Sequence, residues 1–558
     1  MGEMHKGVIG LMGVLALAGC AAAMTASGPA QASEARYEYV EYRGAEPPRA
    51  PEGTYRNPIL PGFHPDPSVV KVGADFYLVN STFSWFPGVP VFHSRDLVNW
   101  RLIGHAITRE SQASFRGLGT NRGIFAPAIS WHDGLFYMVT TCIGCGGNFY
   151  VTATDPAGPW SEPVWLDFEG IDPSLFFDDD GRAWMVNNGL PEGEPRYEGH
   201  RAIWVQEFDI ASGQLTGPRK MIVDGGVHPE DEPIWAEGPH LYKVDGWYYL
   251  MPAEGGTAEQ HSQTIYRAKE PMGPYEPGPF NPILTQRDLD PDRPDRVEAT
   301  GHADLVQLDD GSWWGVFLAT RPFAGQSTLL GRESFLLPVR WVDGWPRFLD
   351  EGEYVPLLVE KPALPESPGT NWTGWREEFD GAALGGEWIS LRAPITSYRL
   401  ANGALVLAPG ADAAGTLGVP SFIGQRMRHH EAAVETTVDF APAAVGDFAG
   451  LMAFMDETHF IALGIEGTGT GREVTLRRRI AAEQPERGEV LAHVPISASG
   501  AIELSMAING GSADFAWRGA GESEWRELAA GVDVEPMASI HAGLFTGVVI
   551  GPYTYAAR

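Results

Sequence analysis

Short apolar segments separated by turn residues recur along most of the chain, while the periodicity of amphipathic helices is largely absent. Five segments share one pattern: a small or acidic residue, an apolar stretch, a turn with glycine or aspartate, and a stretch rich in aromatic residues. Such turns between stretches rich in Val, Phe, Tyr and Trp predict β-hairpins. The copies of the pattern begin at Asp66, Ala126, Asp172, Glu237 and His302.

Successive copies begin 46 to 65 residues apart, which leaves room for one small sheet in each repeat. Sheets repeated at such a period are typical of β-propellers, so five copies predict five blades over residues 55–361. The innermost strand of a blade starts near the propeller axis. We therefore expect the first residues of the five repeats to converge on one central cavity.

The repeat pattern fades after residue 345, and residues 362–371 are rich in Pro, Glu and Ser. Over residues 372–558, apolar strands again alternate with Gly-rich turns, which favours a β-sandwich. A chain of 558 residues also exceeds what one hydrophobic core usually organises. The predicted fold class is all-β, with a five-bladed β-propeller followed by a C-terminal β-sandwich.

The N-terminus has the features of an export signal over residues 1–20. Lys6 precedes an apolar run that is too short for an ordinary transmembrane helix. The run ends in Leu-Ala-Gly-Cys20, which resembles the bacterial lipobox and makes Cys20 the predicted lipidation site. An ordinary secretory peptide cut after Ala32 is the alternative. Both hypotheses predict export, and the lipobox predicts a lipoprotein of the periplasm or outer membrane.

Residues 21–54 are rich in Ala, Pro, Glu and Arg and show no periodic apolar positions. Such a composition predicts a linker between a membrane anchor and a folded domain. Folded structure is expected to begin near Asn57.

Charge and cysteine content exclude two classes of function. The formal net charge of -32 argues against nucleic-acid binding, because a phosphate backbone requires a basic surface. Besides Cys20, the chain has only Cys142 and Cys145, without nearby histidines at zinc-binding spacing. This pair is interpreted as a disulfide or as two free thiols. Contact with a membrane is expected only through the lipid anchor.

Three of the converging first residues are acids: Asp66, Asp172 and Glu237. A single Asp-Pro pair is usually a turn, but three acids at one repeat phase indicate a site. Hydrolysis of a glycosidic bond needs an acid for the leaving oxygen and a base or nucleophile on the opposite side. A third carboxylate can raise the pKa of the acid by like-charge repulsion.

The segments around these acids resemble glycoside hydrolase family 43, particularly its two-domain β-xylosidases and α-L-arabinofuranosidases. The resemblance rests on Asn-Pro-Ile-Leu-Pro-Gly-Phe-His-Pro-Asp66, on Ile-Asp172-Pro-Ser and on Ala-Glu237-Gly-Pro-His, and it extends over nearly the whole mature chain. It implies that Asp66 is the general base, that Asp172 modulates the pKa and orientation of the acid, and that Glu237 is the general acid. It also implies a concanavalin-like sandwich over residues 372–558.

Further segments resemble the sugar site of the family. Leu-Gly-Arg332-Glu-Ser implies that Arg332, rather than Arg321, approaches the sugar and Asp172. Gly-His302 implies a histidine below the carboxylates that helps to hold a water or a calcium ion. No cofactor is expected to be required, and calcium in the propeller centre is a further hypothesis, because a site poor in carboxylates binds this ion weakly.

Aromatic rings are the expected walls of a sugar pocket, because sugar C–H groups pack on them. The candidates are Phe83, Trp85 and Phe125, and Phe545 resembles the family residue by which the sandwich caps the site. A residue of the sandwich core is the alternative for Phe545.

The resemblance implies an inverting exo-hydrolase that releases xylose from the non-reducing ends of β-1,4-xylo-oligosaccharides. An α-L-arabinofuranosidase, or a bifunctional enzyme, acting on arabinoxylan or arabinan is the alternative within the family. Outside the enzymes, the alternative is a surface lipoprotein that binds oligosaccharides. A homo-oligomer is compatible with the resemblance.

Overall fold

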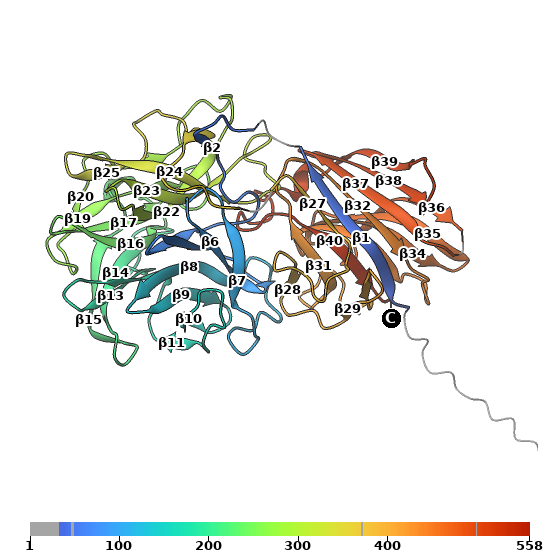
Figure 1. Cartoon of the computed structure of the whole chain (residues 1–558), viewed down its shortest axis with the longest axis horizontal. Coiled ribbons are helices and arrows are strands. Elements are labelled where there is room, and N and C mark those ends of the chain that lie inside the picture. Colours follow the sequence, from blue (N-terminus) through green and yellow to red (C-terminus); the bar gives the residue numbers. More distant parts are fainter. Residues whose placement is uncertain (1–32, 46–48, 370–371, 498, 558) are drawn as a thin grey trace, which may run out of the picture. The chain divides into compact units, whose positions relative to one another are not determined.

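The computed structural model describes residues 33–45, 49–369, 372–497 and 499–557 (Figure 1). The export signal and Cys20 lie outside these residues. The regular structure is almost entirely β-strand, with two short 3-10 helices, η1 (Pro229–Asp231) and η2 (Glu535–Met537), in the described ranges. None of the described helices has the length and apolarity that a membrane crossing requires.

Five sheets follow one another along the first part of the chain, and each forms one blade of a propeller. The first blade contains β3 (Ser68–Val72), β4 (Asp75–Val79), β6 (Gly88–Ser94) and β7 (Arg101–Ile107). The second contains β8 (Gly123–His132), β9 (Leu135–Ile143), β10 (Gly147–Ala153) and β11 (Val164–Leu166). The third contains β12 (Ile171–Phe177), β13 (Ala183–Gly189), β14 (Ala202–Asp209) and β15 (Gln214–Asp224).

The fourth blade is a larger sheet than the others, and the fifth returns to four strands. The fourth contains β16 (Glu237–Val244), β17 (Trp247–Glu254), β18 (Ser262–Gln263), β19 (Tyr266–Ala268), β20 (Glu276–Pro277) and β21 (Leu284–Thr285). The fifth contains β22 (Glu298–Gln307), β23 (Trp313–Thr320), β24 (Glu333–Val342) and β25 (Trp345–Arg347). The prediction of an all-β fold with a five-bladed propeller is confirmed.

The ring of blades is closed by contacts between its two ends. Asn57 and Leu336 exchange two hydrogen bonds of 2.9 Å, which fix the segment before the first blade against β24. The hydroxyl of Ser68 and the backbone N–H of Val69 both donate to Asp304 on β22. Outside the blades, β2 (Thr54–Arg56) pairs with β26 (Leu358–Glu360).

The C-terminal part forms two large sheets that pack face to face around the largest apolar core, which confirms the predicted sandwich. One sheet contains β1 (Ala35–Gly44), β27 (Gly374–Glu377), β29 (Tyr398–Leu400), β30 (Leu405–Leu407), β32 (Glu431–Asp439), β37 (Ile502–Asn509), β38 (Ser512–Gly519) and β39 (Arg526–Asp533). The other contains β5 (Trp85–Phe86), β28 (Ile389–Leu391), β31 (Ser421–Arg426), β33 (Phe448–Asp456), β34 (His459–Thr468), β35 (Gly471–Arg479), β36 (Glu489–Ile496) and β40 (Val549–Tyr555).

The linker predicted over residues 21–54 is wrong for residues 35–44, because these form β1 in the middle of a sandwich sheet. In Figure 1 the blue β1 runs among the orange and red strands. It pairs with β27, β30 and β32, and its side chains at Tyr37, Val40 and Tyr42 are buried in the sandwich core. The sandwich therefore uses strands from both ends of the chain.

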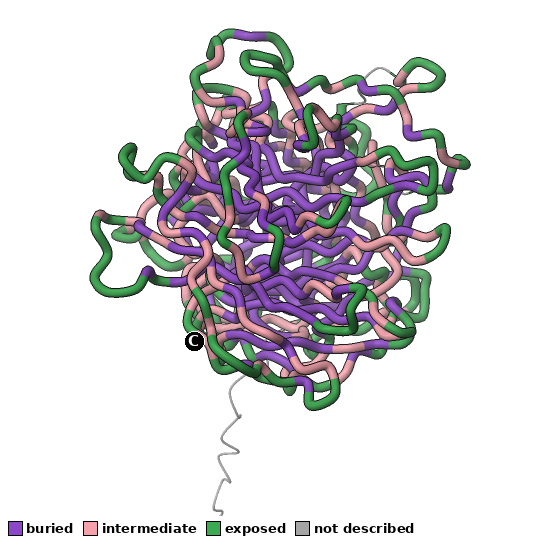
Figure 2. Tube along the Cα trace, turned by 90° about the vertical axis from the view of Figure 1, so that its left-hand side faces the viewer, coloured by how far each residue is buried: buried purple, intermediate pink, exposed green. Residues whose placement is uncertain are grey.

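The propeller and the sandwich share a buried interface. Trp85 and Phe86, which follow β4 of the first blade, pair as β5 with β28 of the sandwich. Arg392 is fully buried, donates to the carbonyl of Leu118 and forms an ion pair with Glu457. Buried residues form a continuous interior, and exposed residues gather in the peripheral loops and turns (Figure 2). The interface thereby fixes propeller loops against the second domain.

Candidate active site

Four of the five inner strands have a non-glycine residue of left-handed backbone conformation within the strand or just before it. Asp66, Ala126, Asp172 and His302 have φ values of 51°, 36°, 53° and 49°. An L-residue rarely adopts this conformation, and it is found preferentially where function requires strain. In blade 2 and blade 3 the residue also lies at a break in the strand register. The shared bend directs successive residues into the central cavity.

Glu237 does not occupy the equivalent position in the fourth blade, contrary to the prediction. The left-handed residue there is Gly238, with a φ of 55°, and Pro239 follows it as Pro67 follows Asp66. A Cβ atom at Gly238 would lie 2.8 Å from the ring of His302, so this position accepts only glycine without rearrangement. Glu237 therefore enters the cavity from one residue earlier on the strand.

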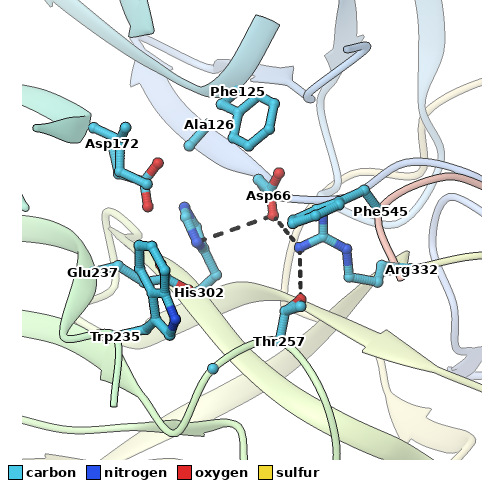
Figure 3. Close-up of a pocket in the computed structure, with 12 residues that line it drawn as sticks. Asp66, Phe125, Ala126, Asp172, Trp235, Glu237, Thr257, His302, Arg332 and Phe545 are labelled. Atoms are coloured by element: carbon cyan, nitrogen blue, oxygen red, sulfur yellow. Dashed lines mark hydrogen bonds and ion pairs between the residues drawn. The ribbon is translucent and has the colours of Figure 1, made fainter. Parts of the chain in front are cut away.

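The converging residues line one cavity of about 210 Å³ (Figure 3). The three predicted carboxylates all line it, as do Phe125, His302, Arg332 and Phe545. The remaining lining residues are Ala126, Ile171, Trp235, Gly256 and Thr257. Residues from all five blades and from the sandwich are thus brought together at one place.

Asp66 lies in a positive, hydrogen-bonding environment. Arg332 Nη1 is 3.0 Å from Asp66 Oδ1, and the Ser81 hydroxyl donates to Asp66 Oδ2 at 2.6 Å. The Nδ1 atom of His302 is 4.0 Å from Asp66 Oδ1. Burial raises the pKa of Asp66, but Arg332, His302 and Ser81 together outweigh it, and the pKa is lowered from its usual value. Asp66 is therefore a carboxylate at neutral pH.

Asp172 and Glu237 lie in the opposite environment. Burial, followed by repulsion from Asp66, raises the pKa of Asp172 to about 7, although the backbone N–H of Gly238 donates to its Oδ2 at 3.2 Å. Burial, followed by the charges of Asp172 and Asp66, raises the pKa of Glu237 well above its usual value. The environment of Glu237 therefore favours its protonated form, whereas that of Asp66 favours the carboxylate.

Arg332 has donors left over for a ligand. It is 4% exposed, and besides Asp66 its Nη1 donates to Thr257 Oγ1 at 3.1 Å. Its Nε and Nη2 atoms are buried and have no hydrogen-bond partner among the described residues. Arg321 instead forms a two-fold hydrogen-bonded ion pair with Glu333 and does not line the cavity. Arg332 rather than Arg321 thus lines the cavity, but its ion pair is with Asp66 and not with Asp172, to which the sequence resemblance assigned it.

The prediction that Phe83 and Trp85 line the sugar pocket is wrong. Both are fully buried in the propeller–sandwich interface. The ring of Phe83 packs behind the cavity, with centroids 4.9 Å from Phe125 and 5.6 Å from Phe545. Phe545 comes from the sandwich and lines the cavity, and Phe83 packs against its ring.

Trp235 and Thr257 line the cavity but were not found from the sequence. Trp235 lies two residues before Glu237, and its ring is covered by the Arg201 guanidinium at 4.4 Å. Both residues lie on loops between strands, where the repeat pattern carries no positional signal. The one sequence feature that could have indicated Trp235 is its position two residues before the acidic Glu237.

A second, wider cavity of about 490 Å³ adjoins the first and shares four of its lining residues. The shared residues are Phe125, Ile171, Trp235 and Phe545. The outer cavity adds the polar side chains of Asn121, Arg122, Glu169, Asn188 and Arg201. A ligand that fills the inner cavity can therefore continue outward between the aromatic residues.

The position predicted for a calcium ion lies below the carboxylates, next to His302. Calcium prefers six to eight oxygen ligands. His302 contributes an imidazole there, and Asp66 is already paired with Arg332 and Ser81. Across the described ranges, no group of three or more His, Cys, Asp or Glu side chains has metal-binding geometry. Burial lowers the pKa of His302 to about 4, so this histidine is neutral at pH 7.

Two sequence families together match nearly all of the described chain. The model of glycosyl hydrolases family 43 matches residues 55–346, and the model of the beta xylosidase C-terminal concanavalin A-like domain matches residues 376–558. A non-reducing end alpha-L-arabinofuranosidase of Bacteroides ovatus is 38% identical over 90% of this chain and 91% of its own length. A beta-xylosidase of Bacillus subtilis is 33% identical over 78% of this chain and 84% of its own length.

Solved structures agree with these matches. A crystal structure of a GH43_12 protein retrieved from a capybara gut metagenome superposes with a TM-score of 0.86 and 36% identity, covering 93% of this chain and 99% of that one. A xylan beta-1,4-xylosidase from Bacillus halodurans superposes with a TM-score of 0.81 and 34% identity, covering 90% of this chain and 96% of that one. Both similarities extend over propeller and sandwich together.

Proposed function

The chain belongs to glycosyl hydrolase family 43 and is a glycosidase, and from this premise we propose that it is an inverting exo-β-xylosidase. Its proposed substrates are β-1,4-xylo-oligosaccharides, from whose non-reducing ends it releases xylose. The observation that carries the proposal is that Asp66 and Glu237 line one cavity in opposite environments, which lower the pKa of Asp66 and raise that of Glu237. The cavity therefore favours a base at Asp66 and an acid at Glu237.

In the proposed mechanism, Glu237 donates its proton to the glycosidic oxygen while the bond from that oxygen to the anomeric carbon breaks. Asp66 accepts a proton from a water molecule, and the oxygen of this water forms the new bond on the opposite face. The products are xylose of inverted configuration and an oligosaccharide shortened by one unit. Asp66 then releases its proton to solvent and Glu237 takes one up, which restores the starting states.

Asp172 and Arg332 influence the pKa values of Glu237 and Asp66. The charge of Asp172 contributes to the raised pKa of Glu237, so it keeps the acid protonated in the resting site. Arg332 holds Asp66 ionised, and its free Nε and Nη2 atoms are the proposed donors to sugar hydroxyls. Hydrogen bonds from a buried guanidinium are stronger than those from neutral donors.

The shape of the site supports action at chain ends. The inner cavity of about 210 Å³ is bounded by Phe545, while the outer cavity of about 490 Å³ leads away from it. We propose that one sugar fills the inner cavity and that the leaving chain extends through the outer one. An internal segment of a long chain would need a groove open at both ends.

The α-L-arabinofuranosidase is the second candidate, because the Bacteroides ovatus relative with that name covers 90% of this chain at 38% identity. Comparing kcat/KM for xylobiose and for an α-L-arabinofuranosyl disaccharide tests which of the two activities is the main one. A ratio above ten in favour of xylobiose supports the xylosidase. The inverse ratio assigns the chain to arabinofuranosides, and similar values make it bifunctional.

We also propose that the enzyme is exported, that Cys20 carries a lipid anchor to the periplasm or outer membrane, and that hydrolysis requires no cofactor. Replacing Cys20→Ala should release the enzyme from the membrane fraction, and full activity should persist in EDTA. Retention of the variant in membranes would contradict the anchor. A homo-oligomer is a further hypothesis, which light scattering of the purified enzyme tests.

A further inference from the structure

Two arginines of the sandwich lie buried against the first blade with guanidinium nitrogens that have no partner. Arg426, at the end of β31, and Arg428 are each 3% exposed. Within the part of the chain that the structure describes, the Nε and Nη2 atoms of Arg426 and the Nε atom of Arg428 have no hydrogen-bond partner. The guanidinium of Arg426 faces the ring of Phe63 at 5.4 Å, and that of Arg428 faces Trp372 at 4.8 Å.

The charges of this cluster do not balance within the described residues. Glu387 is the carboxylate that faces both arginines, and its Oε2 lies 3.5 Å from Arg428 Nη2. No carboxylate of the described chain forms an ion pair with Arg426. Burial lowers the pKa of Arg426 only to about 10, so it remains a cation at pH 7. One positive charge is left without compensation, and a buried charge of this kind is strongly destabilising.

Two histidines complete the cluster. His64 and His105 are buried, and the Nε2 atoms of both have no partner. Burial lowers the pKa of His105 to about 3, with the charge of Arg426 adding to the effect, so this imidazole is neutral and can carry its hydrogen on Nε2. His64 Nδ1 donates to Pro61 O at 3.2 Å, which leaves its Nε2 as an acceptor for a water.

We propose that Arg426, Arg428 and His105 bind a small inorganic anion of the size of chloride between the first blade and the sandwich. The anion supplies the missing negative charge and accepts the unused N–H groups. Every donor is at least nine-tenths buried, which favours a single small ion over a sugar or a peptide. The inference does not depend on the proposed glycosidase substrate.

The position of this anion site links it to the catalytic base. Phe63, beneath Arg426, stacks on Phe83 at 5.8 Å, and Phe83 supports the cavity-lining Phe545. The backbone N–H of His64 donates to the carbonyl of Arg332 at 3.0 Å. An anion at this position therefore stabilises the segment that carries Asp66, on the face of that segment that points away from the substrate.

Thermal unfolding of the whole enzyme at constant ionic strength tests the site. Replacing methanesulfonate by chloride or bromide should raise the Tm by about 2 °C, because a ligand that binds only the folded state stabilises it. Arg426→Met should abolish this difference. Arg472→Met is the matched control, since Arg472 is equally buried but donates to three backbone carbonyls, and it should keep the difference.

A crystal of the unaltered enzyme grown in bromide gives the second readout and does not require any variant to fold. The expected result is an anomalous peak within hydrogen-bonding distance of the Arg426 guanidinium. Water molecules alone at this position, or equal Tm values in chloride and methanesulfonate, would overturn the proposal. A peak seen without any shift in Tm would mean binding at crystal concentration only, and it would overturn the proposed stabilisation.

Discussion

Asp66 lies between an arginine and a serine hydroxyl, whereas Glu237, in the same cavity, lies near two other carboxyl groups and accepts no side-chain hydrogen bond from the described residues. Asp66 is buried and Glu237 is partly buried, so desolvation alone would raise the pKa of each. The difference between them comes from their neighbours. Partner placement, rather than residue type, divides the carboxyl groups into a base and an acid.

The largest effect is expected at the end of the cavity that holds the base. Replacing Asp66→Asn removes the proton acceptor and should lower kcat/KM on xylobiose by about 10⁴-fold. The fold should persist, because the amide oxygen can accept from Arg332 and the amide nitrogen can donate to the Ser81 hydroxyl. Steady-state kinetics with thermal unfolding measures both. A loss of less than tenfold would remove Asp66 from the role of base.

The acid end should respond according to the leaving group. Glu237→Gln should lower kcat/KM by about 10³-fold on xylobiose, whose leaving oxygen needs a proton. On an aryl xyloside with an acidic phenol the loss should be less than about tenfold, because this leaving group departs without protonation. Asp66→Asn is the control, and it should lower kcat/KM by similar factors on both substrates. Equal losses for Glu237→Gln would contradict the assignment.

Weakening the electrostatic difference between Asp66 and Glu237 should shift the pH dependence of kcat/KM. Asp66 must be ionised, so activity falls as the pH drops through its pKa. Arg332→Met removes the main cation that lowers this pKa, so the acidic limb of kcat/KM should move to higher pH, with a loss of about 10²-fold at the optimum. Arg332→Lys keeps a positive charge at this position, so the acidic limb of its kcat/KM profile should stay close to that of the unaltered enzyme. An unchanged limb in Arg332→Met would show that Arg332 does not control Asp66.

The smallest effect is expected at the aromatic wall. Phe545→Ala should raise KM for xylobiose about tenfold, because one buried ring contact with the sugar is lost, and should change kcat less. Trp85→Ala is the control from the interface behind the cavity. It should cost about 3–5 kcal/mol of stability and leave KM unchanged. A raised KM in Trp85→Ala would mean that the interface shapes the pocket directly.

The repeat pattern explains why the fold and the carboxylates could be predicted. Asp66, Asp172 and His302 lie at one phase of a repeat, and the shared left-handed bend brings them together. The pattern could not predict that Gly238 takes the bend in the fourth blade. Steric contact with His302 decides that position, and it depends on a neighbouring blade.

Aromatic residues and the first strand were harder to assign, for different physical reasons. In the sequence, an aromatic residue that lines a sugar pocket looks the same as one in a hydrophobic core. The sequence therefore could not distinguish the buried Phe83 and Trp85 from the cavity-lining Phe125. For β1, the alternation of Tyr37 with charged neighbours was present in the sequence. Its pairing partner β32 lies about four hundred residues later, which no local pattern reveals.

Proton NMR of the enzyme acting on xylobiose tests the central claim most directly, because the anomer released first reports how the two ends of the cavity cooperate. The account predicts that α-xylose appears first and that the β anomer follows by mutarotation, since Asp66 activates a water on the face opposite to the leaving group. Early β-xylose would mean that a carboxylate attacks the sugar itself, and it would contradict the division into base and acid.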